Sequence, residues 1–326
     1  MMRIQQASRS SLRDFKVIGR LGSGSFGTVF KVQRLADSQF YVLKQITMGG
    51  MDAQQQREAI KEVQIMADLD HEYCVRYYDS FIDEGKLNIV MEYCDRGDLQ
   101  RLLKNQGNKK LKEDVIWRLF IQMALGLRYL HTKRILHRDI KSANVFLCKG
   151  NRLKIGDLGV ARVLGTNTHF AQTCVGTPYY LSPELCTGNP YNAKSDVWAL
   201  GCVLYEMCTL KHPFDASNQG ALILKIVSGK YPKVTGEYSK PLRKLVTKML
   251  TRDSKARPSI TQVLMSRTLV QKAEALGIVL PADILEGAAL HDERIVLAAQ
   301  QRAAQRAAQA RAADSKAQEA TRRVMR

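Results

Sequence analysis

The sequence contains few of the residues that mark fibrous, disulfide-rich or low-complexity proteins. Its 326 residues include 8 prolines and 22 glycines, too few for a collagen-like chain or a repetitive linker. The seven cysteines are scattered, odd in number and without a C-x-x-C pair. This pattern favours reduced thiols over a disulfide framework or a zinc site.

Long apolar runs are also missing. The first fifteen residues, MMRIQQASRSSLRDF, lack the apolar centre of a signal peptide. The strongest apolar stretch, residues 197–210, is interrupted by Glu206 and is too short to span a membrane. It predicts a buried helix. These absences predict a cytoplasmic protein with no membrane partner, and the nucleus stays open as an alternative.

What the sequence does contain is ordinary globular composition with a large excess of positive charge. Hydrophobic residues make up 45% and charged residues 25%, and the net charge is +19. The charge fits either a basic, soluble surface or attraction to acidic partners such as tubulin tails and acidic substrates. No nucleic-acid-binding motif accompanies it, so nucleic acid is not the expected partner.

The periodicity of apolar residues changes along the chain. Residues 1–14 show none and are predicted to be disordered. Alternating β-branched and aromatic residues then predict five strands, and helical spacing predicts one helix. These strands cover residues 15–21, 28–35, 39–46, 77–82 and 87–93, and the helix covers residues 51–69.

Beyond residue 95, helical spacing dominates. Asp98 and Ser195 are the expected N-caps of two of the helices. The helices are predicted over residues 99–104, 113–132, 195–209, 220–227 and 242–249, with short strands over 145–147 and 153–155. The sequence therefore predicts an α+β fold with two lobes: a small antiparallel sheet with one helix, and a larger, mainly helical lobe.

Residues 270–326 become rich in alanine and arginine, which are strong helix formers. We expect a helical tail. Its apolar residues are nearly all alanine, with no sustained leucine or isoleucine seam, so a coiled coil and a lone, fraying helix both stay open.

A glycine-rich segment lies between the first two predicted strands. Glycines let a backbone fold closely over a triphosphate and direct N–H groups at it. A dinucleotide-binding loop would be followed by a helix, and a glycine-rich hairpin would need no ligand. Because a strand follows here, a phosphate-covering loop is favoured. Its expected nucleotide contacts are Leu21, Gly22, Ser23, Gly24, Ser25, Phe26, Gly27 and Val29.

Three further segments carry charged groups suited to phosphoryl transfer. Lys44, in the third strand, is placed to neutralise nucleotide phosphates, with Glu62 on the following helix as its expected partner and Glu58 as a less suitable one. In His-Arg-Asp139-Ile-Lys141-Ser-Ala-Asn144, the aspartate would accept the proton of the attacking hydroxyl, the lysine would reach the transferred phosphoryl group, and the asparagine would ligate magnesium.

Asp157 follows the last predicted short strand, in the segment KIGDLG, and is the second expected magnesium ligand. Further along, the segment GTPYYLSPE ends at Glu184. We expect Glu184 to form a buried ion pair with Arg257, and Asp196 to anchor the backbone of the catalytic loop.

These five motifs in this order resemble the eukaryotic protein kinases over residues 15–269, with a small lobe at 15–95 and a large lobe at 96–269. The strings HRDIKSANVFL, KIGDLGVAR, VGTPYYLSPEL and IVMEYCDRGDL resemble the NIMA-related kinases. The resemblance implies a serine/threonine kinase that uses ATP with Mg²⁺, with Mn²⁺ as an alternative, and phosphorylates proteins.

The same resemblance assigns the adenine site and a regulatory site. Met91 would be the gatekeeper, and the hinge would be formed by Glu92, Tyr93 and Cys94; Val29, Val42 and Phe146 would enclose the base. Thr173 would be the activating phosphorylation site, pairing with Arg138 and Arg162. A solvated loop threonine without a regulatory role is the alternative.

The resemblance also implies partners and locations. Expected partners are protein substrates, microtubule-associated proteins and a second copy of the chain bound through the tail, which would promote trans-autophosphorylation. Expected locations are the cytoskeleton, the centrosome or basal body, and the nucleus. Two other functions stay open: a pseudokinase scaffold that binds partners through its basic surface and tail, and a small-molecule kinase. The presence of Lys44, Glu62, Asp139, Asn144 and Asp157 argues against the scaffold.

Three residues depart from the general kinase pattern: Leu158, Ser182 and Val42. We expect Leu158 to stack beside His137 and Met66. Tyr77 is hypothesised to turn into the site and hold an inactive state.

Overall fold

The computed structural model describes residues 10–24, 27–50, 52, 54, 56–57, 63, 66–157 and 178–290. The chain divides into two compact units, Met1–Ile260 and Thr261–Arg326. Most of the elements lie in the first unit.

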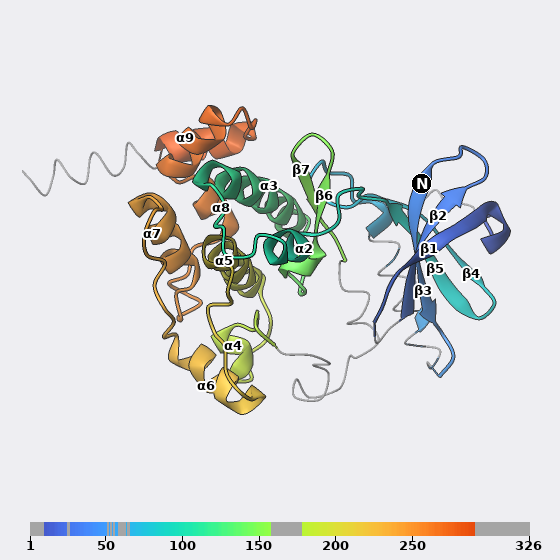
Figure 1. The fold of residues 1–326 in the computed structure, drawn as a ribbon, viewed down its shortest axis with the longest axis horizontal. Helices are drawn as coiled ribbons and strands as arrows, with labels where there is room; N and C mark the ends of the chain where they lie inside the picture. The colour runs from blue at the N-terminus through green and yellow to red at the C-terminus, as the bar shows by residue number, and fades with distance from the viewer. Residues whose placement is uncertain are drawn as a thin grey trace, which may run out of the picture. The chain divides into compact units, whose positions relative to one another are not determined.

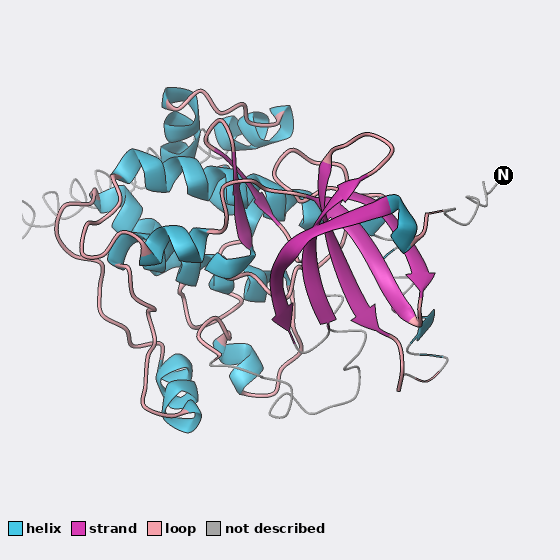
Figure 2. Ribbon diagram, turned by 45° about the vertical axis from the view of Figure 1, so that its right-hand side comes forward, coloured by secondary structure: helices cyan, strands magenta, loops and turns pink. Residues whose placement is uncertain are grey.

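A five-stranded antiparallel sheet forms the first part of that unit (Figures 1 and 2). A short 3₁₀ turn, η1 (Leu12–Asp14), precedes it. Its strand order is β1-β2-β3-β5-β4. The strands are β1 (Phe15–Gly24), β2 (Gly27–Arg34), β3 (Phe40–Thr47), β4 (Tyr77–Asp83) and β5 (Lys86–Glu92). The predicted strands are confirmed, with ends displaced by at most three residues.

Each face of the sheet carries a buried apolar cluster, because successive side chains of a strand point to opposite faces and apolar residues occur in both sets. In β5, Ile89 belongs to one buried cluster and Val90 to the other. The first cluster includes Val63 and Met66, which lie in the predicted helix over 51–69. Within the range predicted for that helix, the structure describes residues 52, 54, 56, 57, 63 and 66–69. Residues 54, 56, 57, 63, 66 and 67 are helical, and residues 52, 68 and 69 are not.

The second part of this unit is mainly helical, as predicted. Its helices are α2 (Leu99–Lys104), α3 (Glu113–Thr132), α4 (Pro183–Cys186), α5 (Ala193–Thr209), α6 (Gln219–Ser228) and α7 (Lys240–Met249). A 3₁₀ turn, η2 (Ser142–Asn144), precedes the hairpin of β6 (Val145–Cys148) and β7 (Arg152–Ile155). Helix α5 is buried along most of its length, which confirms the prediction from its apolar run.

The two predicted helix caps differ in outcome. The carboxylate of Asp98 accepts a hydrogen bond from the Arg101 N–H at 2.8 Å, which confirms it as the cap of α2. The prediction for Ser195 is wrong, because α5 begins at Ala193 and its cap is Asn192, which accepts from the Lys194 N–H at 2.8 Å. The Ser195 hydroxyl instead donates to Glu184.

The second unit begins with residue 261, within α8 (Ile260–Leu264), and continues with α9 (Arg267–Ala275) and helical residues 282–290. Leu269, Ala273, Ile278 and Ile284 are buried. Buried apolar residues thus continue past position 269, where the sequence predicts the tail to begin. Residues 291–326 lie outside the described part. Over the described ranges, no helix is both long and apolar enough to cross a bilayer.

Candidate active site

Three neighbouring strands bring predicted nucleotide-site residues onto one face of the sheet. Val29 of β2 lies directly opposite Lys44 of β3. Val42, two residues before the lysine, lies opposite Met91 of β5. Since alternate residues of a strand share a face and opposed residues are neighbours, these four side chains form one contiguous surface.

The glycine-rich segment closes the β1–β2 hairpin. Gly22 pairs with Val29, and Gly24 pairs with Gly27. A Cβ atom on Gly27 would lie 1.8 Å from the carbonyl oxygen of Gln45, so only glycine fits where β2 meets β3. Ser23 pairs with Thr28, and Leu21 is half exposed. Ser25 and Phe26 lie outside the described residues.

Lys44 forms an ion pair with Asp157, which follows β7. The lysine side chain is 14% exposed and the aspartate side chain 41%. Asp157 has a φ of 58°, and the preceding Gly156 lies so close to Val75 that a Cβ atom would come within 2.5 Å of it. This tight packing fixes where the aspartate emerges. The predicted partner Glu62 lies outside the described residues.

The catalytic-loop residues are joined to one another. The Asn144 amide nitrogen donates to the Asp139 carboxylate and to its backbone carbonyl, each at 2.8 Å. The Lys141 ammonium lies 2.7 Å from the same carboxylate. Asp139 nevertheless remains 44% exposed, so its carboxylate is open to an incoming group.

The donor set fits a hard divalent cation. Both hydrogen bonds of the Asn144 amide use its nitrogen, which turns the amide oxygen into the available ligand atom. The backbone carbonyl of Asn144 accepts from the Gly156 N–H at 3.0 Å. That bond ties the asparagine to the residue before Asp157. Carboxylate and amide oxygens are the ligand types that magnesium prefers.

The predicted hinge begins at Glu92, the last residue of β5. The Glu92 N–H donates to the Arg76 carbonyl at 2.9 Å, so this N–H is not available to adenine. The Glu92 carboxylate pairs with Lys154 at 2.9 Å. Tyr93 and Cys94 continue the segment, which then pairs with β6 through a bridge between Asp98 and Phe146. Phe146 thus lies opposite Asp98, four residues beyond the predicted hinge.

Asp196 is fully buried and holds the catalytic loop by its backbone. Its carboxylate accepts from the N–H groups of His137 at 3.1 Å and Arg138 at 2.9 Å. Two further partners were not predicted: His131 at 2.8 Å and the Tyr191 hydroxyl. Burial alone would raise the pKa of Asp196, but the His131 hydrogen bond and the other donors outweigh it and hold this pKa below its usual value.

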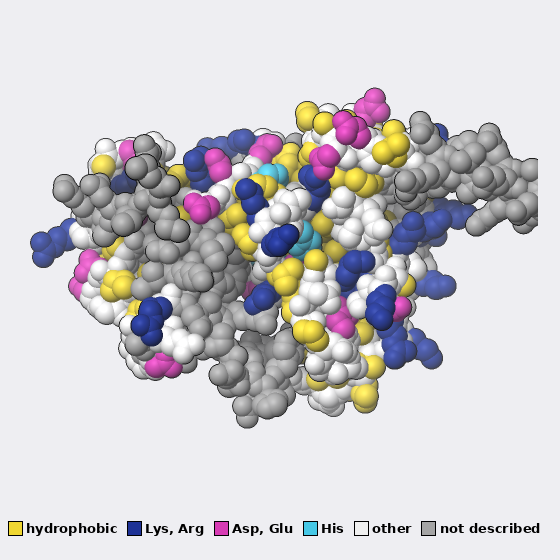
Figure 3. Space-filling view, turned by 180° about the vertical axis from the view of Figure 1, so that it is seen from behind, with side chains coloured by type: hydrophobic (Ala, Val, Ile, Leu, Met, Phe, Trp, Pro, Cys, Tyr) yellow, Lys and Arg dark blue, Asp and Glu magenta, His cyan; other side chains and the backbone are white. Residues whose placement is uncertain are grey.

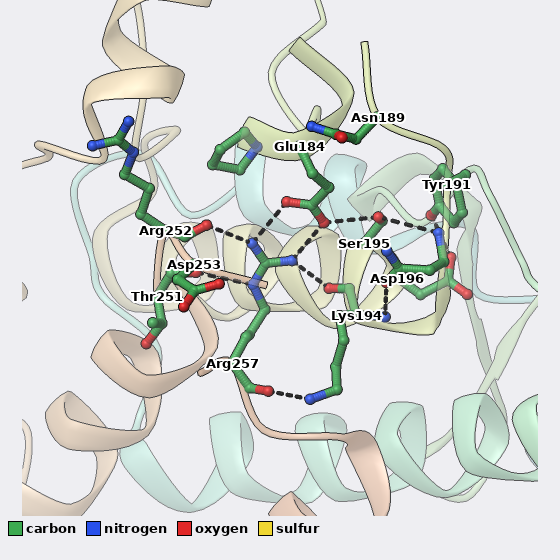
Figure 4. Close-up of polar contacts among 12 residues, drawn as sticks. Glu184, Asn189, Tyr191, Lys194, Ser195, Asp196, Thr251, Arg252, Asp253 and Arg257 are labelled. Atoms are coloured by element: carbon green, nitrogen blue, oxygen red, sulfur yellow. Dashed lines mark hydrogen bonds and ion pairs between the residues drawn. The ribbon is translucent and has the colours of Figure 1, made fainter. Parts of the chain in front are cut away.

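The predicted Glu184–Arg257 pair is present and buried (Figure 4). The guanidinium reaches the two carboxylate oxygens at 2.8 and 3.0 Å. It also donates to the backbone carbonyls of Thr251 and Lys194, and Ser195 donates to the carboxylate at 2.8 Å. Burial opposes ionisation of Glu184, but the Arg257 hydrogen bonds lower its pKa.

A buried hydroxyl–carboxylate cluster was missed by the sequence analysis. The Tyr180 hydroxyl donates to Glu206 at 2.7 Å, and the Ser142 hydroxyl donates to the other carboxylate oxygen at 3.1 Å. Ser142 directly follows Lys141, so this cluster joins the catalytic loop to the segment before α4 and to α5. The sequence feature that could have predicted this cluster is Glu206, a charged residue within an otherwise apolar helix.

Some predictions fall outside the described residues: Leu158, Arg162 and Thr173. Tyr77 is buried with Met66 in one cluster of the sheet lobe. His137 is also fully buried.

Comparison with known proteins agrees with this geometry. Residues 15–268 match the family model described as "Protein kinase domain". The chain is 45% identical to serine/threonine-protein kinase Nek1 of Mus musculus over 255 residues, covering 78% of this chain and 21% of the relative. It is 43% identical to serine/threonine-protein kinase Nek5 of Homo sapiens over 251 residues, covering 77% of this chain and 36% of the relative.

A third relative is the probable serine/threonine-protein kinase nek2 of Dictyostelium discoideum, 42% identical over 257 residues, covering 77% of this chain and 61% of the relative. The chain thus spans between about a fifth and three fifths of the length of these relatives. On the match to the family model and the shared identity, the chain belongs to the protein kinase family and, within it, to the NIMA-related serine/threonine kinases.

Proposed function

We propose that the protein is an active serine/threonine kinase that transfers the terminal phosphoryl group of ATP to hydroxyl groups of protein substrates. The observation that carries this proposal is the arrangement of Asp139, Lys141 and Asn144 in one hydrogen-bonded group. Lys44 and Asp157 are joined by an ion pair nearby, since the Asn144 carbonyl holds the residue next to Asp157.

Each side chain has a distinct role in the proposal. Asp139 orients the substrate hydroxyl and accepts its proton, and Lys141 neutralises charge on the transferred group. Lys44 binds the nucleotide phosphates. Asp157 and the Asn144 amide oxygen hold Mg²⁺, with Mn²⁺ as an alternative, and the bound metal supplies charge neutralisation. Transfer of a phosphoryl group needs mainly positioning and electrostatic stabilisation, which these residues are placed to supply.

The adenine site is proposed to comprise the glycine-rich hairpin and the hinge. Val29, Val42 and Phe146 would contact the base on its faces, and Met91 would be the gatekeeper. The hinge residues Glu92, Tyr93 and Cys94 would bind adenine through their backbones. Because the Glu92 N–H is already used by Arg76, we assign to Glu92 only its carbonyl as a hydrogen-bonding group for the base.

An assay with ATP, Mg²⁺ and a generic basic protein tests the proposal. We expect wild type to incorporate phosphate into serine or threonine, and Lys44→Met and Asp157→Ala to lose this activity while retaining a folded chain by circular dichroism. Wild type that binds nucleotide but transfers no phosphate would instead indicate a pseudokinase scaffold.

Regulation is proposed to act at Thr173, through phosphorylation. Thr173→Ala should then lower activity, and unchanged activity would indicate a solvated threonine without a regulatory role.

The tail at residues 291–326 is proposed to mediate self-association and trans-autophosphorylation. A chain ending at Leu290 keeps all the described buried residues, so equal sedimentation masses of this chain and the full chain would argue against assembly through the tail.

The basic surface supports acidic segments of proteins as partners. Lys240, Arg243 and Lys244 of α7, with Lys233, line a cavity of about 410 Å³ whose other walls include Val234 and Val246. Figure 3 shows Lys and Arg side chains distributed widely over one face. On this basis, and by analogy with related kinases, we propose microtubule-associated proteins as partners. The same analogy suggests the cytoplasm, cytoskeleton, centrosome or basal body, and nucleus as locations.

A further inference from the structure

A lysine of β2 is held between two aromatic rings. The Lys31 ammonium lies 4.3 Å from the centroid of the Phe40 ring and 4.4 Å from the centroid of the Tyr93 ring. Phe40 is the first residue of β3, and Tyr93 directly follows β5 in the predicted hinge. The two ring centroids are 6.5 Å apart, and the ring planes meet at 62°. These three side chains, called here the Lys31 clamp, join three segments of the sheet lobe.

The Lys31 clamp continues the surface that is proposed to bind adenine. Lys31 pairs with Val42, and Val42 in turn pairs with Met91. Phe40 lies two residues before Val42, and Tyr93 lies two residues after Met91. Because β3 runs antiparallel to β5, these two steps lead toward the same end of the surface. Since alternate residues of a strand share a face, the clamp adjoins the residues expected to contact the base, at the hinge end of the sheet.

The charge of Lys31 is directed at rings and not at a carboxylate. None of the ion pairs between residues that the structure describes includes Lys31. An ammonium is attracted to the negative face of an aromatic ring, most strongly where water is partly excluded. Lys31 and Tyr93 are half-buried, whereas Phe40 is 46% exposed. Because one ammonium contacts both rings, a movement of Tyr93 away from β3 would lose this contact.

We propose that Lys31 is a positioning residue for the adenine site: its ammonium holds the Tyr93 ring beside β2 and β3 and thereby fixes the hinge backbone that binds the base. The proposal rests on the proposed kinase function. The preceding hinge residue, Glu92, is already fixed by the hydrogen bond from its N–H to the Arg76 carbonyl at 2.9 Å. The clamp fixes the next residue. A hinge held at two successive residues loses less conformational freedom when the base binds, which strengthens binding.

Lys31→Met tests this role, because it keeps an unbranched apolar side chain and removes the charge. Isothermal titration calorimetry should show that MgATP binds about threefold to tenfold more weakly, as for the loss of a cation–aromatic contact. Lys31→Arg should stay within about twofold of wild type, since a guanidinium also packs on aromatic rings. Lys16→Met, a change to an exposed lysine of β1, is the control and should leave the affinity unchanged. Equal affinities of Lys31→Met and Lys16→Met would overturn the proposal.

Adenosine distinguishes this role from a direct attraction between Lys31 and the nucleotide phosphates. Adenosine carries the base without any phosphate, so a change that acts through the hinge should weaken adenosine and MgATP by the same factor. We therefore expect Lys31→Met to bind adenosine about threefold to tenfold more weakly than wild type does. Weaker binding of MgATP with unchanged binding of adenosine would place the effect at the phosphates and would overturn the proposal.

Urea unfolding without nucleotide tests the contact itself, on Lys31→Met, Phe40→Leu and the double variant. The double variant should lose less stability than the sum of the two single losses, because a shared contact can be lost only once. Additive losses would show that the two side chains do not interact. Lower stability of Lys31→Met with unchanged adenosine affinity would leave the clamp a merely structural role and refute positioning. A wild type that binds neither MgATP nor adenosine would refute the proposed function, while the unfolding measurements would still decide the contact.

Discussion

Two groups of carboxylates in the helical lobe have opposite surroundings. Asp139 and Asp157 are 44% and 41% exposed, and each has a cationic partner. Asp196 and Glu184 are 0% and 8% exposed, with donors surrounding their oxygens. The first group is available to a ligand, whereas the second is saturated by the protein itself. The difference separates residues that act on a substrate from residues that hold the lobe together.

The largest effect predicted from this comparison is on activity, at Asp139. Asp139→Asn keeps the shape of the side chain but removes the base, so we expect the rate of phosphoryl transfer to fall by about 10²–10⁴-fold. Because the side chain is nearly half exposed, thermal unfolding should shift little. A kinase assay and a melting curve on the same protein measure both quantities.

Asp215→Asn is the matched control, since Asp215 is an exposed aspartate remote from the loop in sequence. It should leave both the rate and the melting temperature unchanged. If Asp139→Asn lost stability in proportion to activity, the division between exposed and buried carboxylates would be wrong.

The opposite result is predicted at Arg257. Arg257→Met leaves the buried Glu184 carboxylate without its ion-pair partner, so the free energy of unfolding should fall by about 3–5 kcal/mol. Urea unfolding measures it. Lys255→Met, at an exposed position two residues away, should change it by less than about 0.5 kcal/mol. Equal effects of the two changes would show that the pair contributes no special stability.

Much of the site could be predicted because its residues lie close together in the sequence. Asp139, Lys141 and Asn144 belong to one loop, and their spacing within it carries the chemistry. The Glu184–Arg257 pair was also expected, although the two residues are far apart in the chain. The sheet strands were predictable from their β-branched and aromatic residues, although the burial does not follow a strict period of two: β5 buries residues 87–90 in a row.

The rest depended on long-range packing that composition does not encode. Ser195 looked like a helix cap, but the helix begins at Ala193 with Asn192 as its cap, and the Ser195 hydroxyl inside the first turn donates to the buried carboxylate of Glu184. Glu206 looked like an interruption of an apolar helix, whereas it is the acceptor for Tyr180 and Ser142. In both cases the deciding partner comes from a different segment of the chain.

Tyr180 tests whether a buried carboxylate also affects the catalytic loop, because its hydroxyl contacts both Glu206 and Ser142. Tyr180→Phe removes one donor from Glu206 and should cost about 1.5–3 kcal/mol of stability, with a modest loss of activity through Ser142. Tyr179→Phe is the control, since Tyr179 packs by its ring against His212 at a centroid distance of 4.0 Å. The control should keep both stability and activity, and if Tyr180→Phe behaved like it, the hydroxyl would have no structural role.

The two buried carboxylates should contribute to the pH dependence of stability. The pKa values of Glu184 and Asp196 are lower in the folded protein than their usual values, so the unfolded chain binds more protons in acid. Their contribution is complete above the ordinary carboxylate range, around pH 5, and is lost as pH falls through the folded pKa values.

Removing one of these two buried carboxylates should make the free energy of unfolding depend less steeply on pH. Glu184→Gln should reduce the slope of unfolding free energy against pH below pH 5 by up to about 1.4 kcal/mol per pH unit, the limit for one proton. Slopes are compared rather than absolute stabilities, because the glutamine also leaves Arg257 without its charge partner. An unchanged slope in Glu184→Gln would mean that this buried carboxylate does not contribute to the pH dependence of stability.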